Sequence, residues 1–391
     1  MIAGRINTFT SADLSQSKAL QACTELMRGG SKSFFAAARV LPERIRAPAT
    51  ALYAFCRVAD DAVDSAPDSA SQALALADLQ NRLSNIYAGT PLDHVADRAL
   101  TEVVHTFQIP QPMLAALLEG FEWDAQGRRY HTLDELHEYS ARVAGTVGTM
   151  MAIIMGVRSE AALARACELG AAMQLTNIAR DVGEDARNGR IYLPLSWLRD
   201  AGINPQEWLA APVFDERLGK IVERLLLEAD RLYTRAEAGI SELPRDCRMA
   251  IQAARLLYAE IGNEVRRQGL DSISKRAIVS SARKVALLAL ASGKAIDFVP
   301  RFNTLTYEPT LAEFQFLITA GLNTAQAQAT SVPPSLAQTL VREGDGFLPA
   351  SDKRSFYHRT VWVIDLCERL AQRERTAHYS AMARTADYKS I

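Results

Sequence analysis

The chain has 391 residues, with 44 lysines and arginines against 45 aspartates and glutamates, and its formal net charge is −1. This balance excludes the basic surplus of a general nucleic-acid-binding protein, so we expect no nucleic-acid partner. A hydrophobic fraction of 48% with 23% charged residues is typical of a globular chain and excludes a disordered one.

The cysteines and the first residues bear on where the protein works. Five cysteines lie far apart with no C-x-x-C spacing, and the N-terminal residues contain no continuous apolar run typical of a signal peptide. We therefore expect a cytoplasmic protein with reduced cysteines. The most apolar uncharged stretch, residues 143–157, has 15 residues, whereas a membrane span needs about 20. No transmembrane helix is predicted.

Apolar residues recur at helical spacing along almost the whole chain, and few segments alternate at period two, so the sequence predicts an all-α protein. Ser159 is expected to cap the longest helix, and Asn188 and Gly189 are expected to end it. The predicted helices, in chain order, cover residues 14–28, 47–66, 72–88, 94–107, 111–120, 133–156, 159–187, 215–239, 245–268 and 276–296.

The texture changes after about residue 298, where prolines interrupt shorter apolar runs. We therefore divide the chain into a helical bundle, residues 1–297, and a C-terminal helical appendage of unknown role, residues 298–391. Residues 314–341 carry no charge but contain several glutamines and an asparagine, which makes them too polar to span a bilayer. We expect them to pack on the bundle or to rest at a membrane surface.

A first acidic cluster lies in the second predicted helix. Asp60 and Asp64 are four residues apart, so they share one face of the helix, and Asp61 lies between them. Tyr53 and Arg57 continue the same stripe. Three carboxylates within one helical turn repel one another, so they need a cation nearby, or they belong to a solvated acidic face.

A second acidic cluster repeats this spacing more than a hundred residues later. Asp181 and Asp185 are four residues apart with Glu184 between them, and Asn177 extends the polar stripe. Small apolar residues flank the stripe and Arg180 adjoins it, a pattern that indicates a wall of a polar-mouthed cavity. We expect the two acidic helices to face each other across a bundle.

The apolar residues 143–157 combine glycines with three methionines and two isoleucines. This composition suits a helix that packs closely and lines an apolar tunnel, while ordinary core packing is the alternative for most of these side chains. Gly145 and Gly148 are the stronger candidates for the functional role of a closely packed tunnel wall, because a glycine inside a helix costs about 1 kcal/mol relative to alanine and needs a reason.

Opposed aspartate pairs suit the chemistry of a diphosphate. Mg²⁺ prefers oxygen ligands and is commonly held by a few carboxylates together with phosphate oxygens. Such ions would clamp a diphosphate and stabilise it as a leaving group, with Arg57, Arg180 and Lys32 completing the charge balance. A structural ion-pair network is the alternative for these three cations. A carboxylate-rich Ca²⁺ site would not explain the arginines, and the sequence contains neither a P-loop nor a dinucleotide fingerprint.

Five collinear segments of the chain resemble the squalene/phytoene synthases, which join two prenyl diphosphates head to head, and are most similar to the bacterial phytoene synthases within that family. Together the segments span roughly residues 20–290. They are SKSF at Ser31–Phe34, YAFCRVADDAVD at Tyr53–Asp64, YHTLDELHEYSARVAGTVG at Tyr130–Gly148, QLTNIARDVGEDARNGRIYLP at Gln174–Pro194 and YAEIG at Tyr258–Gly262.

The resemblance implies an isoprenoid-synthase helical bundle around a deep central cavity. It assigns Asp60 and Asp64 to a first aspartate-rich motif and Asp181 and Asp185 to a second, all four being catalytic. The metal ligands that it implies are Asp60, Asp61, Asp64, Asn177, Asp181, Glu184 and Asp185. The implied diphosphate ligands are Ser31, Lys32, Ser33, Arg57, Arg180 and Arg276. Further catalytic residues, in the reaction chamber or at its rim, are Tyr53, Tyr139 and Tyr258.

The activity that the resemblance implies is condensation of two geranylgeranyl diphosphates through a cyclopropyl (prephytoene) diphosphate to 15-cis-phytoene, in carotenoid biosynthesis. Mg²⁺ or Mn²⁺ would be the cofactor, and no NADPH is expected. A membrane surface or downstream carotenoid enzymes are the expected partners. The alternatives are a squalene, dehydrosqualene or presqualene diphosphate synthase acting on farnesyl diphosphate, and a catalytically inactive helical assembly factor.

Overall fold

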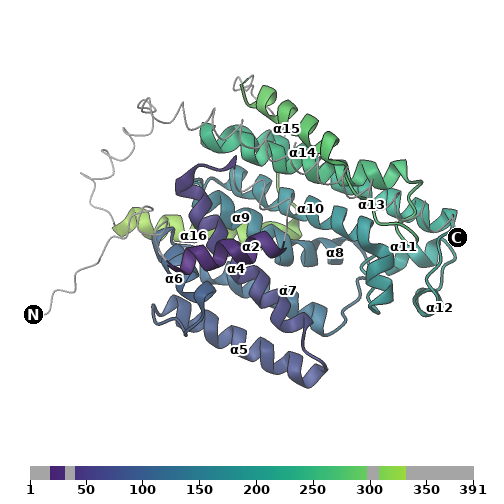
Figure 1. The fold of residues 1–391 in the computed structure, drawn as a ribbon, viewed down its shortest axis with the longest axis horizontal. Coiled ribbons are helices and arrows are strands. Elements are labelled where there is room, and N and C mark those ends of the chain that lie inside the picture. Colours follow the sequence, from purple (N-terminus) through teal and green to yellow (C-terminus); the bar gives the residue numbers. More distant parts are fainter. Residues whose placement is uncertain (1–17, 31–39, 297–307, 332–391) are drawn as a thin grey trace, which may run out of the picture.

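The computed structural model describes residues 18–30, 40–296 and 308–331, which form helices joined by turns, with no β-strand among them (Figure 1). The all-α prediction is confirmed, and the ends of the helices differ from the predicted ends by up to five residues. The α-helices are α2 (Lys18–Gly30), α4 (Glu43–Asp64), α5 (Ser69–Tyr87), α6 (Val95–Thr106), α7 (Gln111–Ala125), α8 (Leu133–Ser140), α9 (Thr146–Ile154), α10 (Glu160–Arg187), α11 (Leu195–Asp200), α12 (Pro205–Ala210), α13 (Glu216–Gly239), α14 (Arg245–Arg267), α15 (Ser281–Ile296) and α16 (Gln315–Ser331). The shorter helical turns are η1 (Ala141–Gly145), η2 (Ile240–Glu242) and η4 (Ala312–Phe314).

The long helix α10 is the centre of the bundle, because it packs against α8, α9, α13, α14 and α16. Its start follows the predicted capping, since the Ser159 hydroxyl accepts a hydrogen bond from the Ala162 amide. Its end follows prediction as well, because Asn188 is the C-cap and Gly189 adopts a left-handed φ of +75°. Capping at both ends therefore defines the helix that carries the second acidic cluster.

Helix α4 begins at Glu43, one turn before the predicted start at Ala47, so the predicted boundary was wrong. The carbonyl of Pro42 accepts hydrogen bonds from the amides of Ile45 and Arg46, which closes the first turn early. Pro48 then lies inside the helix, where its missing N–H removes one backbone hydrogen bond. The remaining turns carry the chain to Asp64, at the end of the first acidic cluster.

The single helix predicted for residues 133–156 is interrupted, since α8 and α9 are separated by the π-helical turn η1. This segment approaches α10 very closely. A Cβ atom on Gly148 would lie 2.2 Å from the carbonyl oxygen of Ala166, and one on Gly170 would lie 2.2 Å from that of Ala144. Only glycine fits at such distances, so the glycine at 148 has the packing role predicted for it.

Two short helices, α11 and α12, lie in a stretch where the sequence analysis predicted none. Each has six residues, too few to show a helical repeat in the sequence. Trp197 and Trp208 anchor them in the core, and Asn204 caps the second by accepting from the Gln206 amide. The segment thereby covers one side of the bundle next to α13.

The described part of the predicted appendage packs on the bundle, as expected. Phe314, Leu317 and Ile318 are fully buried and belong to the same hydrophobic core as the helices before residue 297. Helix α16 contacts α7, α9 and α10. The division of the chain at residue 298 otherwise stays a prediction. In the described ranges, no helix combines the length and the apolar composition needed to cross a membrane.

A buried ion pair joins α5 to α6 and supports a stability prediction. Arg82 donates to both carboxylate oxygens of Asp97 at 2.9 and 2.7 Å, and the Asp97 side chain is fully buried. Asp97→Asn should lower the free energy of unfolding by about 3–5 kcal/mol, because it leaves a buried guanidinium with only the exposed carboxylate of Asp78, 3.8 Å away, as counter-charge. Asp93→Asn is the control: its carboxylate, paired with Arg98, is 98% exposed, so the loss should stay below about 1 kcal/mol. Urea unfolding measures both, and equal effects would contradict this account.

Candidate active site

The two acidic clusters meet at the C-terminal ends of α4 and α10. Asp60 and Asp64 lie in the last turns of α4, and Asp181 and Asp185 lie in the last turns of α10. Arg190, just beyond α10, donates to Asp64 at 2.8 Å and thereby links the two helix ends. The structure therefore brings together the carboxylates that the sequence left more than a hundred residues apart.

Burial, together with crowding, raises the pKa of two of these carboxylates. Burial, followed by the negative charge of Asp64, raises the pKa of Asp60 to about 6. Burial, followed by the charge of Asp181, raises the pKa of Asp185 to about 7. Such shifts indicate a negative field at the ends of the two helices that positive charge would relieve.

The arginines that the sequence pointed to neutralise part of this field. Arg57 pairs with Asp61 at 2.6 Å. Arg180 donates to Asp181 at 2.8 Å, and Arg276 donates to the same carboxylate at 3.0 Å. The remaining partner of Arg276 is Glu184, at 3.3 Å. The alternative of an ion-pair network is thus present, but Arg57 and Arg276 are 42% and 54% exposed, so both could exchange a carboxylate for a diphosphate oxygen.

The sequence analysis missed a third source of negative charge, Asp124 on α7. Its two carboxylate oxygens accept hydrogen bonds from the hydroxyls of Tyr139 and Tyr192, at 2.8 and 2.7 Å. Burial raises the pKa of Asp124 to about 6, and its charge in turn raises the pKa of Asp60 and of Asp185. The available signal was a lone aspartate beside apolar and aromatic residues in FEWDA. Tyr139 therefore positions Asp124. The ring of Tyr139 stacks on that of Tyr192, with 5.2 Å between the ring centroids.

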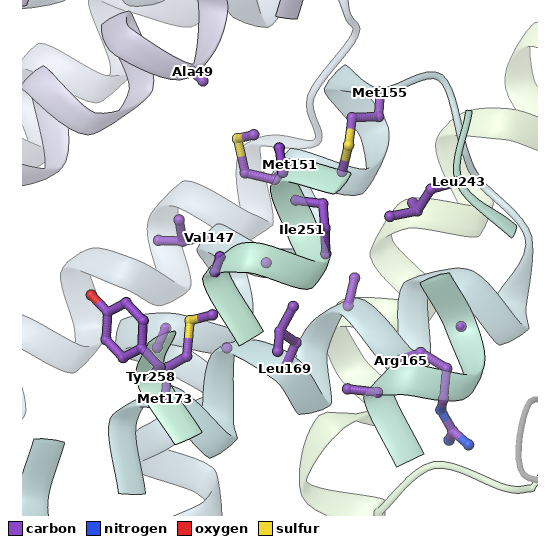
Figure 2. Close-up of a pocket in the computed structure, with 18 of the residues that line it drawn as sticks. Ala49, Val147, Met151, Met155, Arg165, Leu169, Met173, Leu243, Ile251 and Tyr258 are labelled. Carbon is purple, nitrogen blue, oxygen red and sulfur yellow. The ribbon is translucent and has the colours of Figure 1, made fainter. Parts of the chain in front are cut away.

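An apolar cavity extends from this charged end along α10 (Figure 2). Its mouth, the end nearest the aspartates, is lined by the polar side chains of Tyr53, Gln174, Asn177 and Tyr258. From Asn177 back to Ala162 the cavity follows fifteen residue steps of α10, about 22 Å at 1.5 Å per residue. The cavity volume is about 360 Å³, within the ~300–1,000 Å³ of an ordinary ligand pocket, so the cavity is narrow for its length.

The apolar residues 143–157 divide between the two roles considered for them. Met151 and Met155 line the cavity, together with Val147 and Gly148. The other large apolar side chains of α9 are buried in the core of the bundle; they are Met150, Ile153 and Ile154. The helix therefore supplies cavity wall on one face and ordinary packing on the other.

The donor set fits a divalent metal that shares its ligands with a substrate. Among the described residues, no group of three or more acidic, histidine or cysteine side chains lies close enough to hold a metal by itself. The pairs Asp60 with Asp64 and Asp181 with Asp185 offer hard oxygen atoms on facing helix ends, and Mg²⁺ commonly takes one or two carboxylates and completes its octahedron with phosphate and water. The remaining predicted diphosphate ligands, Ser31, Lys32 and Ser33, lie outside the described residues.

Comparison with known proteins defines the class. Residues 27–284 match the squalene/phytoene synthase family, so the chain belongs to that family. It is 50% identical over 310 residues to the phytoene synthase of Cereibacter sphaeroides, covering 77% of this chain and 87% of the relative. It is 53% identical over 270 residues to the phytoene synthase of Rhodobacter capsulatus, covering 69% and 80%. A solved dehydrosqualene synthase structure, 32% identical, superposes with a TM-score of 0.64 over 72% of this chain and 98% of that one.

The raised pKa of Asp124 predicts a pH dependence of stability in chelator-treated protein. Its folded-state pKa of about 6 lies above the ordinary 3.8, so the folded chain holds this proton more tightly than the unfolded chain. The stability that the proton on Asp124 adds to the folded chain is fully present below about pH 4 and is lost as the pH rises through 6. Asp124→Asn should therefore reduce the fall in unfolding free energy between pH 4 and 7 by about 1–2 kcal/mol, measured by urea unfolding.

The control for this experiment is Asp68→Asn. The hydrogen bond from the Ser71 amide lowers the pKa of Asp68. The stability that the Asp68 carboxylate contributes is therefore present above its ordinary pKa of 3.8 and is lost only as the pH falls below that value. This variant should leave the fall between pH 4 and 7 unchanged. If Asp124→Asn gave a curve parallel to that of the wild type, the charge assigned to Asp124 would be wrong.

Proposed function

We propose that the protein condenses two molecules of geranylgeranyl diphosphate head to head, through a cyclopropyl diphosphate, to phytoene in carotenoid biosynthesis. The observation that carries this proposal is the apolar cavity, about 22 Å long, that opens at two opposed pairs of aspartates. Its chemistry matches a substrate with a long hydrocarbon chain and a diphosphate head. The identity of 50% and 53% to two phytoene synthases supports the same reaction.

The acidic helix ends would hold the diphosphate heads through Mg²⁺ or Mn²⁺. The residues that would bind the metal are Asp60, Asp61, Asp64, Asn177, Asp181, Glu184 and Asp185. When bound, the metal supplies Lewis-acid neutralisation of the departing diphosphate. Arg57, Arg180 and Arg276 would stabilise the same charge: Arg57 and Arg276 are exposed enough to exchange a carboxylate partner for a diphosphate oxygen, while Arg180 stays paired with Asp181 beside it.

The cavity protects the carbocations that follow ionisation. Its walls beyond the mouth are mostly aliphatic and sulfur-containing side chains, which keep water away from the cations. Burial raises the pKa of Tyr53 and of Tyr258 at the mouth, so both hydroxyls stay neutral. A proton must leave both when the cyclopropane ring closes and when the final alkene forms. The released diphosphate accepts these protons, either directly or through a neutral tyrosine hydroxyl that takes up one proton and passes its own on.

A synthase of C30 products from farnesyl diphosphate is the second candidate. The superposition on a dehydrosqualene synthase favours it, although at 32% identity this likeness is weaker than that to the phytoene synthases. An inactive assembly factor is disfavoured, because it would have no need for four mutually repelling aspartates at one site.

The C40 hydrocarbon must leave through an apolar route, so we propose association with a membrane surface or with downstream carotenoid enzymes. An apolar side chain beside the charged end supports this, since Ile278, two residues after Arg276, is 70% exposed. Leu290, 49% exposed, lies farther along α15, near the turn that contacts Met249. Lys275 and Arg283 lie near Ile278 in the sequence and are also exposed. A surface of this composition suits contact with anionic lipid headgroups.

Activity should depend on a divalent metal and on both aspartate pairs. Asp60→Asn and Asp185→Asn should each lower turnover by about 100-fold or more, because a ligand for the developing diphosphate charge is lost. Both variants should stay folded, since removal of one carboxylate relieves repulsion in the metal-free protein. Asp93→Asn, on the exposed surface, is the matched control for turnover. Full activity in excess chelator would refute the metal clamp.

The substrate and the final step can be tested together by product analysis. Purified protein with Mg²⁺ should convert the C20 diphosphate to a C40 hydrocarbon without NADPH, because ending the reaction by proton loss needs only a base. Added NADPH should change neither the amount nor the saturation of the product, since hydride is not consumed. A product made only from C15 diphosphate, or only with NADPH, would favour the second candidate.

A further inference from the structure

A buried ion-pair network lies at the end of the cavity opposite the aspartates. Glu168 on α10 is completely buried and accepts hydrogen bonds from Arg165 at 2.8 Å and from Arg235 at 3.0 and 2.8 Å. Arg235, on α13, also pairs with the carboxylate of Glu308 and donates to the carbonyl of Pro309 at 2.7 Å. Two arginines and two glutamates thus balance in charge.

Arg165 belongs both to this network and to the cavity. Its alkyl stem lines the closed end of the cavity, while its guanidinium points away from the cavity toward the network (Figure 2). The stem packs directly on α13, because a Cβ atom on Gly239 would lie 2.3 Å from the Cβ of Arg165. Met155 and Leu243 line the same end and are 6% and 7% exposed. We call Met155, Arg165, Gly239 and Leu243 the floor of the cavity.

The floor is held in part by residues outside the region that matches the family. That region ends at residue 284, whereas Glu308 and Pro309 follow it. The carbonyl of Glu308 accepts from Arg165 at 3.1 Å, so this segment contacts the floor directly. Phe314 and Leu317, fully buried in the core, anchor the segment to the bundle. The C-terminal segment therefore supports the floor from outside the cavity.

We propose that the stem of Arg165 sets the longest prenyl chain that the cavity accepts, and that Glu168, Arg235 and Glu308 hold it in place. Arg165 is thus a specificity-determining residue, and Glu308 is a positioning residue. The inference rests on the proposed function and adds the determinant of chain length. One five-carbon unit adds about 5 Å, from four carbon–carbon bonds, which is close to one helical turn of 5.4 Å. The position of the floor along α10 therefore decides whether one more unit fits.

The test compares kcat/KM for the C15, C20 and C25 all-trans prenyl diphosphates, measured separately with excess Mg²⁺. Arg165→Ala removes the stem and should raise the C25-to-C20 ratio at least tenfold. Arg165→Met keeps an unbranched stem but loses the ion pairs that hold it, so the ratio should rise less than in Arg165→Ala, by about as much as in Glu308→Gln. Arg217→Ala is the control, because its guanidinium is 56% exposed at the start of α13, and it should leave the ratio unchanged.

Glu308→Gln tests the positioning role. It weakens the hold of Arg235 on the segment without changing the cavity lining, so the C25-to-C20 ratio should rise severalfold. A purely structural role would lower turnover of both substrates equally and leave the ratio at its wild-type value, which would overturn this part of the proposal.

A second route to the same floor guards against misfolding of the arginine variants. Met155→Ala enlarges the floor without touching the ion pairs and should also raise the C25-to-C20 ratio. An unchanged ratio in folded Arg165→Ala, or in Met155→Ala if the former aggregates, would overturn the inference. Failure of the proposed function is distinguishable, because the wild-type protein would then make no C40 hydrocarbon from the C20 diphosphate.

Discussion

Mutual repulsion of carboxylates at one end of an apolar cavity is the constraint on which the rest of the structure depends. The pKa values of Asp60 and Asp185 are raised because burial and, after it, the neighbouring acids oppose their charge. Helix packing holds them together regardless, since α4 and α10 are embedded in one hydrophobic core. Arginines on both helices, together with Arg190 beyond α10, offset part of the charge. The balance left over is negative and is available to cations that arrive with a substrate.

The ion pairs at the two ends of the cavity differ in their exposure to solvent. At the mouth, arginines such as Arg57 and Arg276 are about half exposed, so their ion pairs can exchange at little cost. At the floor, Arg165 and Glu168 are buried, and burial lowers the pKa of the first and raises that of the second. Such a network is costly to break, because an unpaired buried charge would remain. Because the ion pairs at the mouth are exposed, they can be replaced by contacts to a diphosphate. Because those at the floor are buried, they keep the end of the hydrocarbon site rigid.

Close packing between helices gives the cavity its walls. At 148 and 170 there is no room for a Cβ atom between the η1–α9 segment and α10. The π-helical turn η1 lies where this approach begins, directly after Tyr139, whose hydroxyl binds Asp124. The same segment therefore shapes the apolar tunnel and orients a tyrosine of the charged end.

The sequence alone determined the helical class, the bounds of α10 and the two aspartate pairs, because periodicity, capping and four-residue spacing are local properties that a chain displays without its fold. It also carried the resemblance from which the reaction was predicted. Only the tertiary structure decided which groups meet. Asp124 binds Tyr139 and Tyr192, which are 15 and 68 residues away in the chain, and Glu308 pairs with Arg235, which is 73 residues away. A helical pattern shows which face is buried but not which helix covers it, so contacts between distant residues become visible only once the helices pack.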